Sequence, residues 1–165
     1  KYRSYYYSQP FIKASGQLTL NAETLKVQGE GWFDHEWSSQ LADKDALGWD
    51  WFSLHLDNGD KLMMFAMHVN NASPYLTGTY ITADGQATTL TESDLSMQAL
   101  GYEHINKRKV PVEWQIEVAQ PTLSLTVKPF KKGQWNASRF SYYEGRVEVS
   151  GSHHGDGFME LTGYQ

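Results

Sequence analysis

The sequence predicts an all-β protein with antiparallel strands, and three observations lead to this fold class. Apolar and polar residues alternate with a period of two along much of the chain, whereas a helical period is almost absent. Turn residues such as Gly, Asn and Asp separate these segments at intervals of about 8 to 12 residues. Six Trp, ten Tyr and seven Phe suit the pleated surface of strands. About ten such strands form a sandwich or, as we favour, a closed antiparallel barrel.

The first expected strands form hairpins around short turns. Segments 18–20 and 25–27 flank Asn21-Ala22-Glu23 and continue into residues 29–37. Asn58-Gly59 separates segments 48–56 and 61–69, and Asn-Gly between two alternating runs is a strong hairpin signal. A third hairpin is expected from segments 76–83 and 87–91. The later strands are expected at 95–100, 114–119, 123–128, 142–150 and 157–164, with rim loops at 38–47 and 101–113.

Composition and charge restrict the class of protein. The 165 residues fit one domain, and the absence of cysteine excludes disulfide bonds, thiolate metal sites and a thiol nucleophile. Because the net charge is −5 and the basic clusters 107–109 and 131–132 lie in loop-like segments, nucleic acid is not an expected partner. The chain starts at Lys1 without an initiator Met, so we expect that a preceding leader or domain is missing.

Motifs along nearly the whole chain resemble one family. They follow the opening Tyr5-Tyr6-Tyr7-Ser8-x-Pro10 and are Gly29-x-Gly31-Trp32-x-Asp34-His35-Glu36-Trp37, Gly48-x-Asp50-Trp51-Phe52-x-Leu54-x-Leu56-Asp57-x-Gly59, Tyr143-Glu144-Gly145 and Gly155-x-Gly157-Phe158-x-Glu160-Leu161-Thr162-Gly163-Tyr164. This set resembles the AttH-like lipocalin-like proteins. They are related to the carotenoid 1,2-hydratases (hydroxyneurosporene synthases) and are often labelled predicted secreted hydrolases.

The resemblance implies a two-lobed protein in which each lobe is a lipocalin-like, calycin-type β-barrel. This chain would be the C-terminal lobe, with residues 1–10 as the lead-in from a missing N-terminal lipocalin-like lobe and residues 11–165 as the barrel domain. The resemblance also implies a periplasmic or secreted location, or a place at the membrane beside a transporter. A hydrophobic small molecule is the implied partner, and we expect no cofactor.

Asp50 is the candidate proton donor. Alternation places it on one strand face with Phe52 and Leu54, whereas Trp51 lies on the other. An apolar environment disfavours the charged form of a carboxyl group, as a general acid requires. Protonation of an isolated double bond also requires aromatic faces that stabilise a carbocation, for which Trp32, Trp37 and Trp51 are candidates. The alternative is a structural Asp50 that accepts backbone N–H groups or pairs with an arginine.

The motif at residues 29–37 divides between two strand faces. Phe33, His35 and Trp37 share one face, so the acidic neighbours of His35 lie on the other with Trp32. We expect Phe33 and Trp37 to point inward, so that His35 holds a water molecule or relays a proton, since imidazole titrates near neutrality. The alternative is that His35 donates to a backbone carbonyl and stiffens the strand end.

Other candidate contacts carry weaker signals. Phe52 and Met64 lie in apolar runs that form either the core or the wall of an adaptable pocket. Glu160 alternates with Phe158, which allows an inward position or a hydrogen bond at the closing strand. His153-His154 with Asp156 lacks the spacing of a metal site, so we expect a solvated hairpin there and no metal. The sequence contains no Gly-x-Ser-x-Gly motif, so it offers no nucleophile that would support the name hydrolase.

These observations support three hypotheses about function. We favour a lobe that binds a hydrophobic small molecule, in transport or secondary metabolism. The alternative is a hydratase or isomerase that adds water to an isolated C=C bond of a terpenoid or prenylated substrate. Asp50 would then be the general acid and His35 would position the water. A third hypothesis is a structural lobe that completes a cleft with the missing half.

Overall fold

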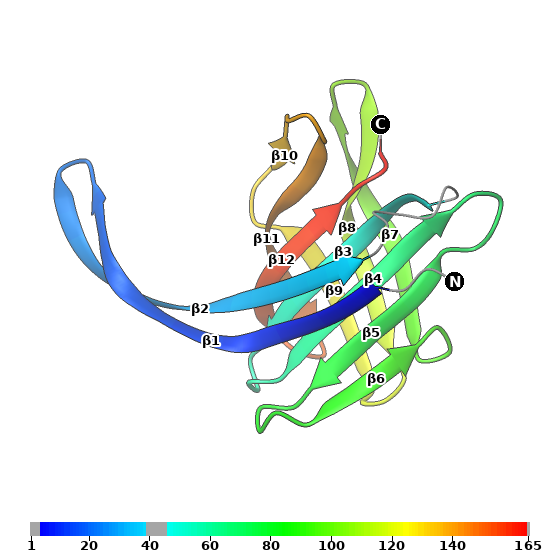
Figure 1. Ribbon diagram of the computed structural model, residues 1–165, viewed down its shortest axis with the longest axis horizontal. Coiled ribbons are helices and arrows are strands. Elements are labelled where there is room, and N and C mark those ends of the chain that lie inside the picture. The colour runs from blue at the N-terminus through cyan, green and yellow to red at the C-terminus, as the bar shows by residue number, and fades with distance from the viewer. Residues whose placement is uncertain (1–3, 39–45, 165) are drawn as a thin grey trace. The chain divides into compact units, whose positions relative to one another are not determined.

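The structure, a computed structural model, describes residues 4–38 and 46–164 (Figure 1). Every regular element in this part of the chain is a strand, which confirms the all-β prediction. The chain divides into two compact units, residues 1–44 and residues 45–165, and each is described by itself. The predicted boundary at residue 10 concerns a longer, two-lobed protein and stays a prediction.

The first unit is one long β-hairpin. Strand β1 (Ser4–Leu20) pairs antiparallel with β2 (Glu23–Ser38), from Ser4 opposite Ser38 to Leu20 opposite Glu23. Asn21 and Ala22 make the turn with φ angles of 50° and 66°, the left-handed geometry of a two-residue hairpin turn. The predicted hairpin around residues 21–23 is confirmed. A register shift between Gln9 and Ile12 interrupts the ladder.

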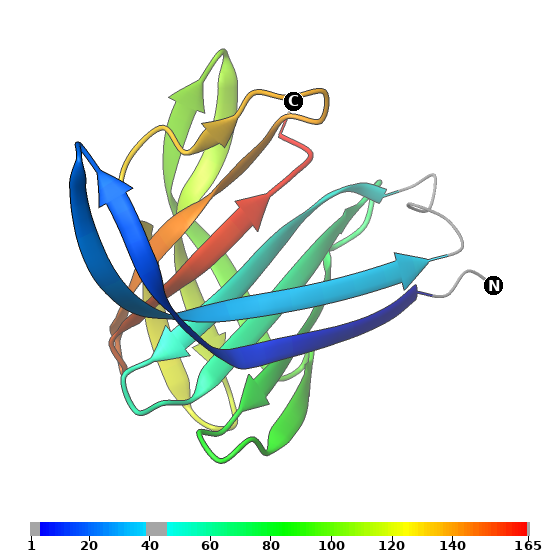
Figure 2. The same ribbon diagram turned by 60° about the vertical axis from the view of Figure 1, so that its left-hand side comes forward.

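The second unit is a curled antiparallel sheet (Figure 2). Nine strands follow the order β6-β5-β4-β3-β12-β11-β9-β8-β7, and the short β10 pairs with β11. The expected closure of the barrel is wrong for the described residues: the sheet curls into a half-barrel, in which the end strands β6 and β7 are not paired with each other. The strands are β3 (Ala46–Leu56), β4 (Lys61–Val69), β5 (Tyr75–Ile81), β6 (Ala87–Thr91), β7 (Leu95–Ile105), β8 (Arg108–Val118), β9 (Leu123–Pro129), β10 (Trp135–Asn136), β11 (Tyr142–Gly151) and β12 (Gly155–Leu161).

The predicted hairpins of this unit are confirmed, and one predicted loop is wrong. β3 and β4 join at Asn58-Gly59, and β5 pairs with β6 as expected. Residues 101–113 are not a rim loop, since β7 and β8 run through them to a turn at Asn106-Lys107 with φ angles of 49° and 71°. Of the other predicted loop, 38–47, residues 39–45 lie outside the described part of the chain.

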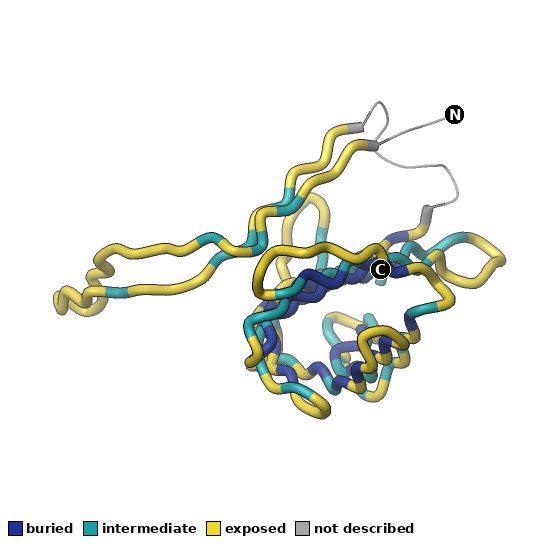
Figure 3. Tube along the Cα trace, turned by 90° about the horizontal axis from the view of Figure 1, so that it is seen from below, coloured by how far each residue is buried: buried dark blue, intermediate teal, exposed yellow. Residues whose placement is uncertain are grey.

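The hydrophobic core lies on the inner face of the curled sheet. Inward residues alternate along each strand, as Phe52 and Leu54 do on β3, and both are fully buried. Phe52 meets Trp114 of β8 with ring centroids 5.7 Å apart, so strands distant in the sheet order face each other across the core. In Figure 3 the buried residues follow the strands of this unit, whereas the hairpin residues are exposed or intermediate.

Candidate functional site

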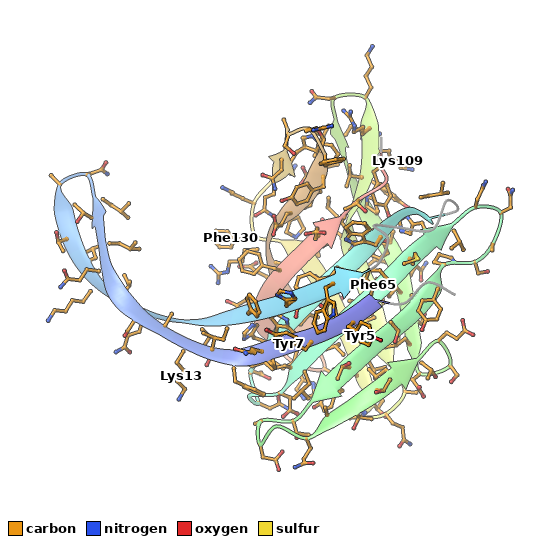
Figure 4. All side chains as sticks on the ribbon, in the orientation of Figure 1. Tyr5, Tyr7, Lys13, Phe65, Lys109 and Phe130 are labelled. Atoms are coloured by element: carbon orange, nitrogen blue, oxygen red, sulfur yellow. The ribbon has the colours of Figure 1, made fainter. Side chains whose placement is uncertain are left out.

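The hairpin presents a row of rings that we call the aromatic face, formed by Tyr5, Tyr7, Phe33, His35 and Trp37. The register places Tyr5 opposite Trp37 and Tyr7 opposite His35, so these side chains project from the same side of the two strands. Tyr5 stacks on Trp37 with ring centroids 5.6 Å apart, and Tyr7 stacks on His35 at 5.7 Å. Figure 4 labels Tyr5 and Tyr7 on β1.

The aromatic face is open to solvent. Tyr5 is 56% exposed and Trp37 is 51% exposed, and Tyr7 and Phe33 are also classed as exposed. His35 lies between two other rings of its strand, 6.2 Å from Phe33 and 5.5 Å from Trp37 between centroids. The predicted grouping of Phe33, His35 and Trp37 is therefore confirmed, but they share an exposed row rather than a buried one.

The opposite side of the hairpin holds the other half of the motif. Trp32 donates from Nε1 to Asp34 Oδ1 at 2.7 Å, and the hydroxyl of Tyr6 donates to the same carboxylate. These contacts agree with the predicted division of residues 29–37 between two faces. They also place Trp32 away from the row that contains Trp37.

In the second unit, three polar residues form what we call the Asp50 group: Asp50, His68 and Tyr164. Asp50 is 3% exposed and projects from β3 on the side of Phe52, as predicted. His68 Nε2 lies 2.8 Å from Asp50 Oδ2, and the Tyr164 hydroxyl donates to both carboxylate oxygens at 2.9 and 3.1 Å. The rings of His68 and Tyr164 meet edge to face with centroids 5.4 Å apart. The partner predicted for a structural Asp50, an arginine, is replaced by a histidine and a tyrosine.

Close backbone contact between two glycines brings Tyr164 to Asp50. A Cβ atom on Gly48 would lie 2.5 Å from the Thr162 carbonyl oxygen, and one on Gly163 would lie 2.3 Å from the Leu47 carbonyl oxygen. Gly163 also has a φ of 85°, which other residues rarely adopt. Backbone N–H of Thr162 donates to the carbonyl of Trp49 at 2.8 Å, which fixes the crossing. Glycines at positions 48 and 163 thus allow the close crossing that places Tyr164 beside Asp50.

Hydrogen bonding to a carboxylate sets the proton affinity of His68. The hydrogen bond to Asp50 raises the pKa of His68 above 6.5, burial lowers it in part, and the negative charge of Asp50 raises it further. Burial, together with the charge and the hydrogen bond of Asp50, raises the pKa of Tyr164. Tyr164 therefore stays a neutral donor, whereas His68 readily holds a proton. In chemical terms the group is a carboxyl group held by two donors, and the histidine among them binds a proton more tightly than a free imidazole does.

The predicted pair of Asp50 and His35 is divided between the two units. Asp50 belongs to the curled sheet and His35 to the hairpin. Their roles as general acid and water-positioning residue stay predictions. Within its own unit each has different neighbours: aromatic rings surround His35, whereas a histidine and a tyrosine hold Asp50.

The remaining predicted contacts lie on both faces of the sheet. Phe52 and Met64 pair across β3 and β4 and are fully buried in the core, and ligand contact by them stays a prediction. Trp51 lies on the other face of β3, half-buried, beside Glu160 of β12. Glu160 does not face inward, because its neighbours Met159 and Leu161 occupy the core.

Glu160 instead accepts a hydrogen bond from Trp49 Nε1 at 2.7 Å. Burial raises the pKa of Glu160, the bond from Trp49 lowers it in part, and the charge of Glu144 on β11 raises it. Glu144 lies directly opposite Glu160 in the ladder, so two carboxylates share this face of the sheet.

Sequence reasoning missed His68 and Tyr164. The signal for His68 was present, because a hairpin centred on Asn58-Gly59 pairs Asp50 with Ala66 and Gly48 with His68. Residues two positions apart on a strand project from the same face. His68 is two positions beyond Ala66, the residue opposite Asp50, so it lies diagonally opposite Asp50 on the same face. Tyr164 was expected within a strand over 157–164, but β12 ends at Leu161, so alternation along that strand does not position Tyr164.

The described residues contain neither a candidate metal site nor a candidate membrane-spanning helix. No group of three or more His, Asp or Glu there could hold a metal ion. Asp156, from the discounted His153-His154 cluster, pairs with Arg146 Nη2 at 3.0 Å. No helix within residues 4–38 and 46–164 is long and apolar enough to cross a bilayer.

Comparison with known proteins places this fold in a family. The sequence pattern described as AttH-like matches residues 1–164. A protein from Nitrosomonas europaea provisionally named AttH (NE1406), with a crystal structure at 2.00 Å resolution, is 32% identical with a TM-score of 0.88. The match covers 98% of this chain and 53% of that one, so the chain spans about half its length. Among proteins of curated function, none matches. The chain belongs to the AttH-like family.

Proposed function

We propose that this chain is one lobe of a larger AttH-like protein and binds a hydrophobic small molecule on the aromatic face of its hairpin. The observation that carries the proposal is the exposed row of Tyr5, Tyr7, Phe33, His35 and Trp37. Contiguous exposed apolar surface marks interaction sites in soluble proteins, because leaving it in water is unfavourable. The rings already contact one another, so little side-chain entropy is lost when a ligand covers them.

The chemistry of the row indicates the class of ligand. Aromatic rings offer flat apolar surface with a negative π face, which suits unsaturated or ring-containing hydrocarbons. His35 supplies a polar group in the middle of the row, between Phe33 and Trp37. A molecule with an apolar body and one hydroxyl group, such as a prenylated phenol, matches this pattern.

The packed core supports a surface site over a site inside the sheet. The inward positions Phe52 and Met64 are fully buried among side chains of the chain itself. A ligand inside the curled sheet would have to displace these side chains, which costs several kilocalories per mole. The exposed rings need no such rearrangement.

Calorimetric titration of the natural full-length protein with a geranylated phenol tests the proposal. Trp37→Ala should weaken binding about tenfold, as expected for loss of an aromatic anchor. Trp32→Ala is the matched control, since it removes the same side chain from the same strand on the opposite face. Equal affinities of the two variants would place the ligand elsewhere.

A second candidate function is hydration of an isolated C=C bond, and the Asp50 group favours it. A proton from this group would form a C–H bond as the π bond breaks. Water would then add to the carbocation and return its second proton to the group. His68, whose side chain is 22% exposed, would meet the substrate, and together with the buried Asp50 it would act as one proton reservoir for both steps.

Mass spectrometry tests this second candidate. The full-length protein is incubated with polyenes and prenylated phenols, and the product of hydration gains the mass of one water. Asp50→Asn should abolish the product while the far-ultraviolet circular dichroism stays unchanged. A folded Asp50→Asn protein that retains activity would remove Asp50 from the mechanism.

A further inference from the structure

We propose that the distal part of the hairpin, residues 12–31, is a docking arm whose apolar face is covered by a β-sheet of the other half of the larger protein. We call this segment the arm. It is separate from the aromatic face, which lies at the opposite end of the same two strands. The proposal is independent of the proposed ligand.

The register divides the arm into an apolar and a polar side. Leu18 lies opposite Leu25, and Gly16 opposite Val27, on one side of the ladder. The alternate positions carry polar pairs, such as Gln17 opposite Lys26 and Lys13 opposite Glu30. This pattern is that of a sheet with one face in water and one face against a core.

Among residues 4–38 and 46–164, no hydrophobic core includes the apolar side of the arm. Leu18, Leu20 and Leu25 are 51%, 57% and 41% exposed. None of them belongs to the hydrophobic core, which is built from residues of the second unit. A two-stranded hairpin is at best marginally stable in water and needs a further layer against its apolar face. The arm therefore requires a partner surface to keep the conformation that it has here.

Two glycines on this side indicate close approach of another backbone. A Cβ atom on Gly16 or Gly29 would meet nothing within 4 Å, and neither residue has a left-handed φ. Among the described residues, therefore, neither a left-handed turn nor a close neighbouring atom accounts for glycine at these two positions. Glycine weakens a strand, and one reason for its use in a strand is the close approach of another backbone, which is the reason we propose here. Both residues lie on the same side as Leu18, with Ala14 opposite Gly29.

The length of the related protein identifies the occupant. Almost all of this chain matches the Nitrosomonas europaea structure but covers only 53% of it, so that protein holds nearly as much chain again. A sheet from such a second half supplies what the arm lacks: an apolar face that packs about 10 Å away. The polar side, with Lys13 and Lys26 exposed, stays in water.

Amide hydrogen exchange compares the arm in the natural full-length protein and in the 165-residue chain. We expect exchange in residues 12–31 to be at least tenfold slower in the full-length protein. Leu25→Asp should remove this protection, because it places a charge on the apolar side. Thr24→Asp, one residue away on the polar side, is the matched control and should leave the slow exchange of the arm unchanged. Equal exchange in the two proteins, or equal effects of the two variants, would overturn the proposal.

Gly16→Val gives a test in which the two proteins respond in opposite directions. In the 165-residue chain, the Cβ atom of valine meets no atom within 4 Å and valine favours a strand, so arm exchange should slow or stay the same. In the full-length protein the added methyl groups should clash with the partner sheet and speed arm exchange. If the 165-residue chain instead dimerises through the arm and Leu25→Asp makes it monomeric, the occupant is a second copy and the proposal is wrong.

Discussion

Asp50 keeps a carboxylate inside an apolar sheet because two side chains donate to it. Burying a carboxylate without partners is costly, and each hydrogen bond from His68 or Tyr164 offsets part of that cost. The three residues also differ in solvent access, since His68 is 22% exposed at its side chain and Asp50 only 4%. Of these two residues, His68 is therefore the one that solvent reaches, and its contact with Asp50 raises its pKa.

The pKa of His68 makes stability dependent on pH. Because its pKa in the folded protein is raised above the unfolded value of 6.5, protonated His68 contributes fully to the free energy of unfolding below that pH. The contribution should decline as the pH rises from 6.5 through the higher folded pKa. Nuclear magnetic resonance titration of the His68 ring protons should give a midpoint above 6.5 in the native protein.

Removal of the Asp50 charge should lower that midpoint below 6.5. In Asp50→Asn, the hydrogen bond to a carboxylate and the negative charge, which both raise the pKa of His68, disappear. Burial remains and disfavours the imidazolium ion. Tyr164→Phe is the control, since it leaves the Asp50 charge in place and the midpoint above 6.5. A midpoint that does not move in Asp50→Asn would show that the carboxylate is not the cause.

Tyr164→Phe should itself destabilise the curled sheet. It removes a hydroxyl that donates to a buried carboxylate, and a hydrogen bond to a charged group contributes about 1.5–3 kcal/mol. Urea unfolding followed by circular dichroism measures the change in free energy. Tyr75→Phe, at an exposed tyrosine, is the control and should change the free energy by less than about 0.5 kcal/mol. Equal effects would mean that the Tyr164 hydroxyl does not stabilise Asp50.

Alternation along a strand predicted where Asp50 points, but not what it touches. The inward face of β3 follows from the spacing of Phe52 and Leu54 alone. Predicting the contact between His68 and Asp50 requires the register of the β3–β4 hairpin, which the Asn58-Gly59 turn fixes. The contact between Tyr164 and Asp50 depends on a crossing of two backbone segments at Gly48 and Gly163. A sequence pattern does not show which segments cross.

Turns and glycine contacts determine the shape of the individual elements. The two-residue turns at Asn21-Ala22 and Asn106-Lys107 have left-handed φ angles at both central residues, which Asn adopts more readily than most residues. Pro111 and the polar and basic residues of segment 101–113 are typical of a loop, so the hairpin at Asn106-Lys107 was not predicted from sequence. Most strands were predicted correctly because the alternation of apolar and polar residues is a local pattern. The full length of β7 and β8 depends instead on recognising the turn that joins them.

Comparison of two glycines separates backbone strain from close contact. Gly85 and Gly163 have similar φ angles, 90° and 85°, but a Cβ atom on Gly85 would meet nothing within 4 Å. Gly85→Ala should therefore cost only the strain of a left-handed alanine, about 1–2 kcal/mol. Gly163→Ala should cost more, because its Cβ would lie 2.3 Å from a carbonyl oxygen and would displace Tyr164. Urea unfolding measures both, and equal costs would contradict the close contact.

The chain as a whole combines a self-contained sheet with a hairpin that has no core of its own. Composition and alternation predicted the all-β class and about ten strands. The open edge between β6 and β7 and the separate hairpin were not predictable, because both depend on which strands pair over long sequence distances. Membership in the AttH-like family and the half-length match agree with a lobe that functions within a larger protein.

Shortening the hairpin should leave the stability of the curled sheet unchanged. Every residue of the hydrophobic core lies in the second unit, from Phe52 to Leu161. Replacing residues 13–30 by an Asn-Gly turn should therefore change the free energy of unfolding of the sheet by less than about 0.5 kcal/mol. Phe52→Ala, which empties a fully buried site, should lower it by about 3–5 kcal/mol. Urea unfolding followed by near-ultraviolet circular dichroism compares the two variants. A shortened chain as unstable as Phe52→Ala would mean that the arm contributes to the sheet's core.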